Sequence, residues 1–134
     1  MAVELKKEAL DLGIVSNNQD EMVAFYRDVL GLKEGPEMKF PGMLIRPLEC
    51  GNSRIKIVHM KHEPTTSAAP GGLGGATGMR YFTLWISNLD ETLAACEAAG
   101  AKLAVPVTDA GAGARICIVE DPDGNWVELV EAAG

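Results

Sequence analysis

Apolar and polar positions follow the same order twice along the chain. Short apolar segments at residues 12–15 and 82–86 are each followed by a polar turn, SNNQD or SNLDE. Next comes a stripe of apolar side chains at three- and four-residue spacing, which predicts an amphipathic helix. Each stripe ends at a glycine, Gly31 or Gly100, the residue that most readily adopts the left-handed turn after a helix. The stripe residues are Met22, Phe25, Tyr26, Val29 and Leu30 in the first half, and Leu93, Ala94, Cys96 and Ala98 in the second.

The polar turns also supply residues that can begin these helices. Asn18 or Asp20 in the first half, and Asn88 or Asp90 in the second, are predicted N-caps. Their side-chain oxygens are suited to accept hydrogen bonds from the unpaired backbone N–H groups of a first helical turn.

Strand patterns follow each predicted helix, so each half is predicted to be a βαβββ module. The strand segments are GMLIRPLECG and RIKIVHMK in the first half, and AKLAVPV, RICIVED and WVELVE in the second. The sequence therefore predicts a single α+β domain over residues 1–134, with modules at 9–61 and 80–131. Residues 62–79 form a linker rich in Gly and Pro, which is either a plain connector or a lid over a site.

Composition and charge narrow the classes of function. The 134 residues carry a net charge of −7, which argues against a nucleic-acid or anionic-membrane partner. No apolar segment approaches the roughly 20 residues that a membrane span needs, and the N-terminal residues show no export signal. Three cysteines, Cys50, Cys96 and Cys117, lack a CxxC arrangement and are interpreted as reduced thiols of a cytoplasmic protein.

Two motifs within the duplicated pattern point to a family. FYRDVLGL in the first half and DPDGNWVEL near the end resemble the vicinal oxygen chelate superfamily of glyoxalases, bleomycin-resistance proteins and extradiol dioxygenases. The resemblance implies two modules whose curved sheets form a half-barrel cleft, usually in a homodimer. It also implies a small-molecule ligand or substrate. In the enzymes of the family, a divalent metal is held by the first and last strands of both modules.

Alignment to that family pattern places the four metal-ligand positions at Asp11, Lys56, Tyr81 and Glu128. Carboxylates such as Asp11 and Glu128 have lone pairs for a metal. Tyr81 is a poor ligand while its phenol is protonated. Lys56 has no lone pair when charged and would repel a dication. No metal is therefore favoured; a bound Ni, Mn, Zn, Co or Mg ion would be held by Asp11 and Glu128.

Lys56 admits three interpretations. Its ammonium could neutralise Asp11 and Glu128 in place of a metal ion. It could instead point outward without a role, or a shifted strand register could restore metal binding. Two-residue alternation puts His59 on the opposite face from Lys56, away from the cleft.

Further ligand-binding candidates are one arginine and two tryptophans. Arg46 is either an anchor for an anionic group or a solvated strand residue. Alternation puts Trp126 on the same face as Glu128, and Trp85 on the same face as Tyr81. Aromatic walls of this kind suit flat or apolar ligands, whereas the alternative is that both tryptophans fill the core.

Three functions are consistent with these residues. The first is a metal-free binding protein of the bleomycin-resistance type, whose acidic surface favours a cationic ligand. The second is a divalent-metal-dependent lyase, isomerase or dioxygenase, in which Glu128 is both a metal ligand and a base. The third is a metal-independent acid–base enzyme that uses Lys56 with Glu128 or Asp11. The sequence names no ligand or substrate.

Overall fold

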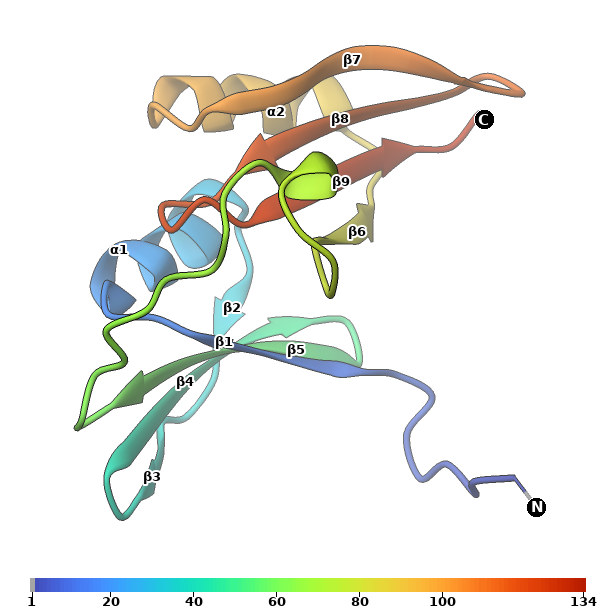
Figure 1. Ribbon diagram of the computed structural model, residues 1–134. Coiled ribbons are helices and arrows are strands. Elements are labelled where there is room, and N and C mark those ends of the chain that lie inside the picture. The colour runs from blue at the N-terminus through green and yellow to red at the C-terminus, as the bar shows by residue number, and fades with distance from the viewer. Residues whose placement is uncertain (1) are drawn as a thin grey trace. The chain divides into compact units, whose positions relative to one another are not determined.

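The repeated pattern folds into two mixed β-sheets, each accompanied by its own helix (Figure 1). The structure is a computed structural model that describes residues 2–134. The chain divides into two compact units between Thr65 and Thr66, inside the predicted linker. Unit 1 and unit 2 below denote these two parts. The α+β class and the two tandem modules predicted from the sequence are confirmed; unit 2 has the predicted βαβββ order, and unit 1 has one additional short strand after its helix.

Unit 1 contains a five-stranded sheet with the order β1-β5-β4-β2, in which β3 also pairs with β4. The first strand runs parallel to the last, and the remaining pairs are antiparallel. Its strands are β1 (Asp11–Val15), β2 (Lys33–Glu34), β3 (Met38–Phe40), β4 (Met43–Cys50) and β5 (Ser53–Met60). Its helical segments are α1 (Gln19–Ala24) and the π-helical turn η1 (Phe25–Val29).

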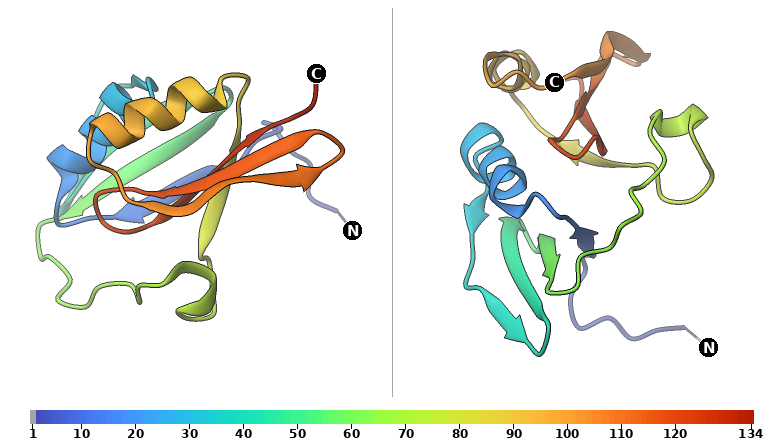
Figure 2. Two further views of the ribbon diagram at one scale, coloured as in Figure 1. Left: turned by 90° about the horizontal axis from the view of Figure 1, so that it is seen from above. Right: turned by 60° about the vertical axis from the view of Figure 1, so that its left-hand side comes forward.

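Unit 2 repeats this topology with a four-stranded sheet in the order β6-β9-β8-β7. Again the first strand is parallel to the last, and the others are antiparallel. Its strands are β6 (Tyr81–Trp85), β7 (Leu103–Gly111), β8 (Ala114–Glu120) and β9 (Trp126–Glu131). Its helices are α2 (Leu89–Ala98) and the short 3₁₀ helix η2 (Gly72–Gly74), which Figure 2 shows within the linker.

Strand alternation places the most deeply buried side chains of each last strand on one face. In β5 the side chains of Ile55 and Ile57 are buried, and at the aligned positions of β9 those of Val127 and Leu129 are buried too. The residues between them, Lys56 and Glu128, point to the opposite face of their strands. The predicted facial pattern of the two last strands is therefore present in both units.

The motif FYRDVLGL forms the end of the first helix. Phe25 and Tyr26 are buried and their rings contact edge to face, with centroids 5.1 Å apart. The amide of Leu30 donates to the carbonyl of Phe25, a five-residue step that widens the helix into a π-turn. Gly31 then takes a positive φ of 78°, as the predicted helix stop requires.

The motif DPDGN forms the turn between β8 and β9. Asp121 is 4% exposed, and its Oδ1 accepts hydrogen bonds from the backbone amides of Asp123 and Asn125. The amide of Gly124, at φ 87°, donates to the carbonyl of Asp121. The first residues of this family motif thus build the hairpin that leads into Glu128.

Some details differ from the sequence prediction. Asn88 lies at the N-cap of α2, but its side chain makes no capping hydrogen bond to the backbone. Instead, Glu131 Oε2 accepts the backbone N–H of Leu89 at 2.9 Å, so a carboxylate from β9 caps the helix. The strand predicted at residues 101–107 is β7, which continues to Gly111 because the long β7–β8 hairpin extends the pairing.

Candidate functional site

In unit 2 the candidate residues of the site lie together on one face of the sheet. The parallel register pairs Tyr81 with Trp126, Thr83 with Glu128, and Trp85 with Val130. Tyr81 is 48% exposed and Trp85 72% exposed. The Thr83 hydroxyl donates to Glu128 Oε1 at 2.7 Å, so one carboxylate oxygen is held in place on the sheet. This face therefore presents two accessible aromatic rings beside an oriented carboxylate.

The same register in unit 1 carries different side chains. Here Asp11 pairs with Arg54, and Gly13 pairs with Lys56. The aligned positions are Asp11 with Tyr81, Gly13 with Thr83, and Lys56 with Glu128. Thus the two last strands, which have the same pattern of deeply buried residues, carry opposite charges at the equivalent half-buried position.

Asp11 is surrounded by cationic and N–H groups. Lys7 Nζ donates to its Oδ1 at 2.7 Å, and Lys56 Nζ lies 3.5 Å from its Oδ2. The backbone amide of Arg54 also donates to Oδ1, at 3.2 Å. The hydrogen bond from Lys7, followed by the charges of Lys7 and Lys56, lowers the pKa of Asp11 below its ordinary value of 3.8. Lys56 therefore meets one carboxylate of its predicted pair, and its pairing with Glu128 stays a prediction.

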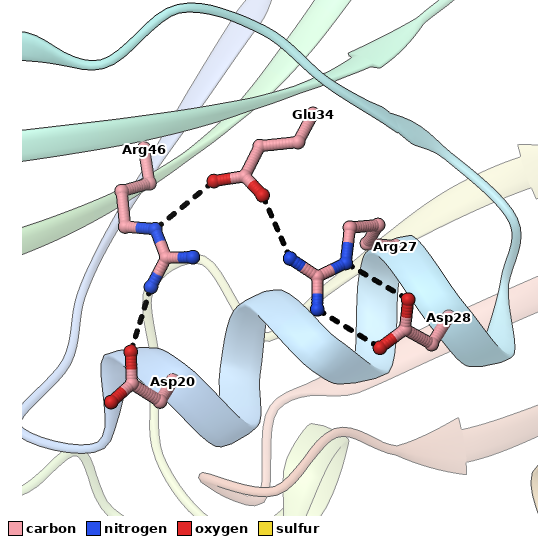
Figure 3. Close-up of polar contacts among 5 residues, drawn as sticks. All are labelled: Asp20, Arg27, Asp28, Glu34 and Arg46. Carbon is pink, nitrogen blue, oxygen red and sulfur yellow. Dashed lines mark hydrogen bonds and ion pairs between the residues drawn. The ribbon is translucent and has the colours of Figure 1, made fainter.

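Arg46 lies on the face of the first sheet that bears the helix, two positions from the buried Leu48 (Figure 3). Its Nη1 donates to Asp20 of α1 at 2.8 Å, and its Nε donates to Glu34 at 3.1 Å. Glu34 also accepts from Arg27. Burial raises the pKa of Glu34, but the bonds from Arg27 and Arg46 outweigh it and the net pKa is lowered. The guanidinium of Arg46 thus joins strand to helix through these two carboxylates, and its role in ligand binding stays a prediction.

Sequence reasoning left the linker as a connector or a lid and did not predict its contact with Trp126. Gly72 is buried against the indole: a Cβ added there would lie 2.1–2.3 Å from three ring atoms of Trp126. Arg80, directly before β6, donates to the carbonyl oxygens of Ala69 and Gly72, each at 2.7 Å. The signal for this contact in the sequence was Arg80, which follows a glycine-rich segment. A guanidinium group can donate to several exposed backbone carbonyls at once.

Residues 2–134 contain no cluster of three or more His, Cys, Asp or Glu side chains placed to hold a metal ion. In the same part of the chain, no helix has the length and apolar character that crossing a membrane demands.

Comparison with known proteins identifies the family of this chain. The sequence profile of the Glyoxalase/Bleomycin resistance protein/Dioxygenase superfamily matches residues 10–129. The chain belongs to this superfamily. The match includes both motifs described above and nearly all of both modules, so the resemblance read from the sequence is confirmed. No curated protein sequence matches the chain.

Several solved structures share the fold. A glyoxalase family protein from Bacillus cereus is 19% identical, with a TM-score of 0.83 over 98% of this chain and 97% of that one. TioX from Micromonospora sp. ML1 is 22% identical, with a TM-score of 0.70 over 94% and 99% of the two chains. A glyoxalase I mutant from Zea mays is 18% identical, with a TM-score of 0.79 over 96% of this chain and 46% of that chain. At such identities the likeness establishes the fold alone.

Proposed function

We propose that this superfamily member is a binding protein for a flat, cationic small molecule, and that it works without a resident metal. The observation that carries the proposal is the exposed face of unit 2, where Tyr81 and Trp85 stand beside the oriented carboxylate of Glu128. Binding requires no further chemistry from these residues.

The aromatic rings favour a flat cation for two reasons. Ring faces attract cations electrostatically, by about 0.5–1 kcal/mol at exposed sites and more once water is removed. Glu128 adds a full negative charge on the same face, and the net charge of −7 strengthens the attraction at long range. A flat anion would gain the stacking but meet the repulsion of Glu128.

The side chains at the four family ligand positions do not fit a divalent metal. A metal needs about three donors with available lone pairs. Asp11 already accepts from Lys7 and lies 3.5 Å from the ammonium of Lys56, which itself occupies another of the four positions. Tyr81 supplies only a phenol, and Glu128 is hydrogen bonded to Thr83. The donor chemistry therefore supports binding without a metal.

The ligand class is tested with two flat probes of opposite charge, proflavine and 2-naphthoate, titrated while tryptophan fluorescence is followed. We expect proflavine to bind and 2-naphthoate to bind at least about tenfold more weakly, a difference of about 1.4 kcal/mol. Glu128→Gln keeps the shape of the side chain and should abolish this preference.

Glu97→Gln on α2 is the matched control, because it removes one exposed acid from the helix. It should leave the preference for proflavine unchanged. Equal affinity of the wild-type protein for both probes, or tighter binding of 2-naphthoate, would contradict the proposed ligand class.

Metal independence is tested by thermal unfolding with Ni, Mn, Zn, Co or Mg ions. A ligand of the folded state at a hundred times its Kd adds about 2.7 kcal/mol, so a resident metal would raise the melting temperature clearly. We expect no rise. A rise that disappears in Asp11→Asn or Glu128→Gln would instead support the alternative, a metal-dependent lyase, isomerase or dioxygenase.

The proposal includes a homodimer, as is frequent in the superfamily. It is supported by the position of β6 at the edge of its sheet, where one side of the strand has no neighbouring strand within residues 2–134. Sedimentation velocity across a concentration series tests it, and a monomer at all concentrations would contradict this part of the proposal.

A further inference from the structure

A segment of the linker is fastened to unit 2 by one arginine. We call residues 69–75 the strap. Arg80 holds it through three carbonyl oxygens: Nη2 donates to Ala69 at 2.7 Å and more weakly to Pro70 at 3.4 Å, and Nε donates to Gly72 at 2.7 Å. Carbonyl dipoles are the partners of this guanidinium, and no ion pair of Arg80 with a carboxylate is formed within residues 2–134.

The strap lies on the indole of Trp126. The backbone of Gly72 is in contact with the ring, because an added Cβ would lie 2.1 Å from Cε2 and 2.3 Å from Cζ2. Gly72 also has a φ of 55°, in the left-handed region that side chains disfavour. Only glycine therefore fits here while the strap is closed. In Figure 1 the yellow-green turn of η2 is seen beside β9, the strand that begins with Trp126.

The closed strap leaves one polar atom unsatisfied. Trp126 Nε1 is buried and has no hydrogen-bond partner within residues 2–134, although Trp126 borders a cavity of about 280 Å³ under the strap. A buried donor without a partner destabilises the state that contains it, and opening would expose this donor to water. The strap also contains four glycines, which lose more conformational entropy on ordering than other residues do. Both features lower the stability of the closed strap relative to an open one.

We propose that the strap is a displaceable gate, in which the peptide backbone at Gly72 occupies the stacking place of a flat ligand on Trp126. Trp126 shares its sheet face with Glu128, so a ligand attracted by that carboxylate reaches the indole only after Arg80 releases the strap. The ligand part of this inference rests on the proposed function. The gate itself is a property of the free protein and can be tested without any ligand.

Acrylamide quenching of Trp126 fluorescence tests the gate, in a Trp85→Phe background that leaves Trp126 as the single tryptophan. Gly72→Ala cannot keep the strap closed, and we expect at least a twofold rise of the quenching constant. Gly74→Ala is the matched control in the same turn, because a Cβ at Gly74 would have no atom within 4 Å among residues 2–134 apart from Gly74 itself and its two chain neighbours. It should quench like the unsubstituted background.

Arg80→Gln provides a second route to the open state, because it removes the guanidinium that binds the strap while leaving Gly72 in place. It should raise the quenching constant as Gly72→Ala does, with an unchanged far-UV circular dichroism spectrum. The gate is refuted if a folded Arg80→Gln protein quenches like the background, and this holds even where Gly72→Ala fails to fold.

Proflavine titration of Arg80→Gln and Gly74→Ala in the chain with both tryptophans tests the ligand part. A ligand that binds only the open strap has an apparent Kd equal to its intrinsic Kd divided by the fraction of protein in the open state. We therefore expect about tenfold tighter binding in Arg80→Gln, where the open fraction is larger, and no change in Gly74→Ala. Unchanged proflavine affinity in a variant with higher quenching would overturn the stacking role of Trp126. Absence of proflavine binding in every protein would contradict the proposed function, while the quenching result would still decide the gate.

Discussion

The two units have the same topology, but they carry opposite chemistry on the exposed face of the sheet. At aligned positions unit 1 has Lys56 and unit 2 has Glu128, while Asp11 aligns with Tyr81. In unit 1 the charges satisfy one another, with Lys56 3.5 Å from Asp11. In unit 2 the carboxylate lies beside exposed aromatic rings.

The opposite faces, which bear the helices, resemble each other instead. In unit 1 Arg46 of β4 binds Asp20 in the first turn of α1, and in unit 2 Arg115 of β8 binds Asp90 in the first turn of α2. Both arginines thus link the strand that is third in the order of its sheet to the start of the helix in the same unit. The comparison teaches that the duplicated scaffold is preserved on the buried side, whereas the ligand chemistry has diverged on the other side and is concentrated in unit 2.

The comparison is tested most strongly in the two cores. Ile57 and Leu129 occupy aligned positions of β5 and β9, and both are fully buried. If the two cores contribute equally to stability, Ile57→Ala and Leu129→Ala should each lower the free energy of unfolding by about 2–5 kcal/mol, as measured by urea denaturation. Both substitutions remove several methyl or methylene groups and leave a cavity.

Val15→Ala is the control for this pair, because Val15 is 52% exposed on the other face of the first sheet. It should change the free energy of unfolding by no more than about 0.5 kcal/mol. A large loss in only one of the two core variants would show that the similarity of the units is topological and not energetic.

The sequence predicted the scaffold well because the repeat pattern depends on local periodicity. The alternation in WVELVE and RIKIVHMK correctly gave the buried and exposed faces of β9 and β5. It did not give the contacts of Arg46, since its partners Asp20 and Glu34 are distant in sequence and are brought close by the strand order. It also missed the contact of Gly72 with Trp126, because a glycine-rich segment has no pattern that fixes its path.

A second difference between the units is how their stability responds to low pH. Glu131 accepts a hydrogen bond from the backbone amide of Leu89 and pairs with Arg115. The bond from Leu89 is the largest cause, and the bond from Arg115 the next, of a pKa of Glu131 that lies below its ordinary value of 4.5. A carboxyl group whose pKa is lower in the folded than in the unfolded state stabilises the fold above the unfolded value. That stabilisation is lost as pH falls through the folded pKa. The aligned residue of unit 1 is His59, so this acid-sensitive cap belongs to unit 2.

Glu131→Gln tests this difference. The advantage of the wild-type protein over the variant in the free energy of unfolding should be full at neutral pH. It should shrink once the pH drops below about 4.5, the ordinary carboxyl value. The protection factor of the Leu89 amide, which compares its exchange rate with the intrinsic rate at the same pH, should fall over the same interval. Glu97→Gln serves as the control and should show no such pH dependence relative to the wild-type protein. A stability advantage of the wild-type protein over Glu131→Gln that is independent of pH would exclude the proposed titration.

The smallest expected effect distinguishes the two lysines beside Asp11. Lys7 forms the shorter contact, 2.7 Å against 3.5 Å for Lys56, and its hydrogen bond is the largest cause of the lowered pKa of Asp11. Lys7→Met should therefore raise the pKa of Asp11 more than Lys56→Met does, as followed by NMR titration of the Asp11 carboxyl carbon. Lys33→Met is the control, because it removes one exposed lysine from β2. A larger rise in the pKa of Asp11 in Lys56→Met than in Lys7→Met would mean that Lys56, at the position aligned with Glu128, is the principal partner of Asp11. The charge contrast between the two units would then be stronger than the contact distances indicate.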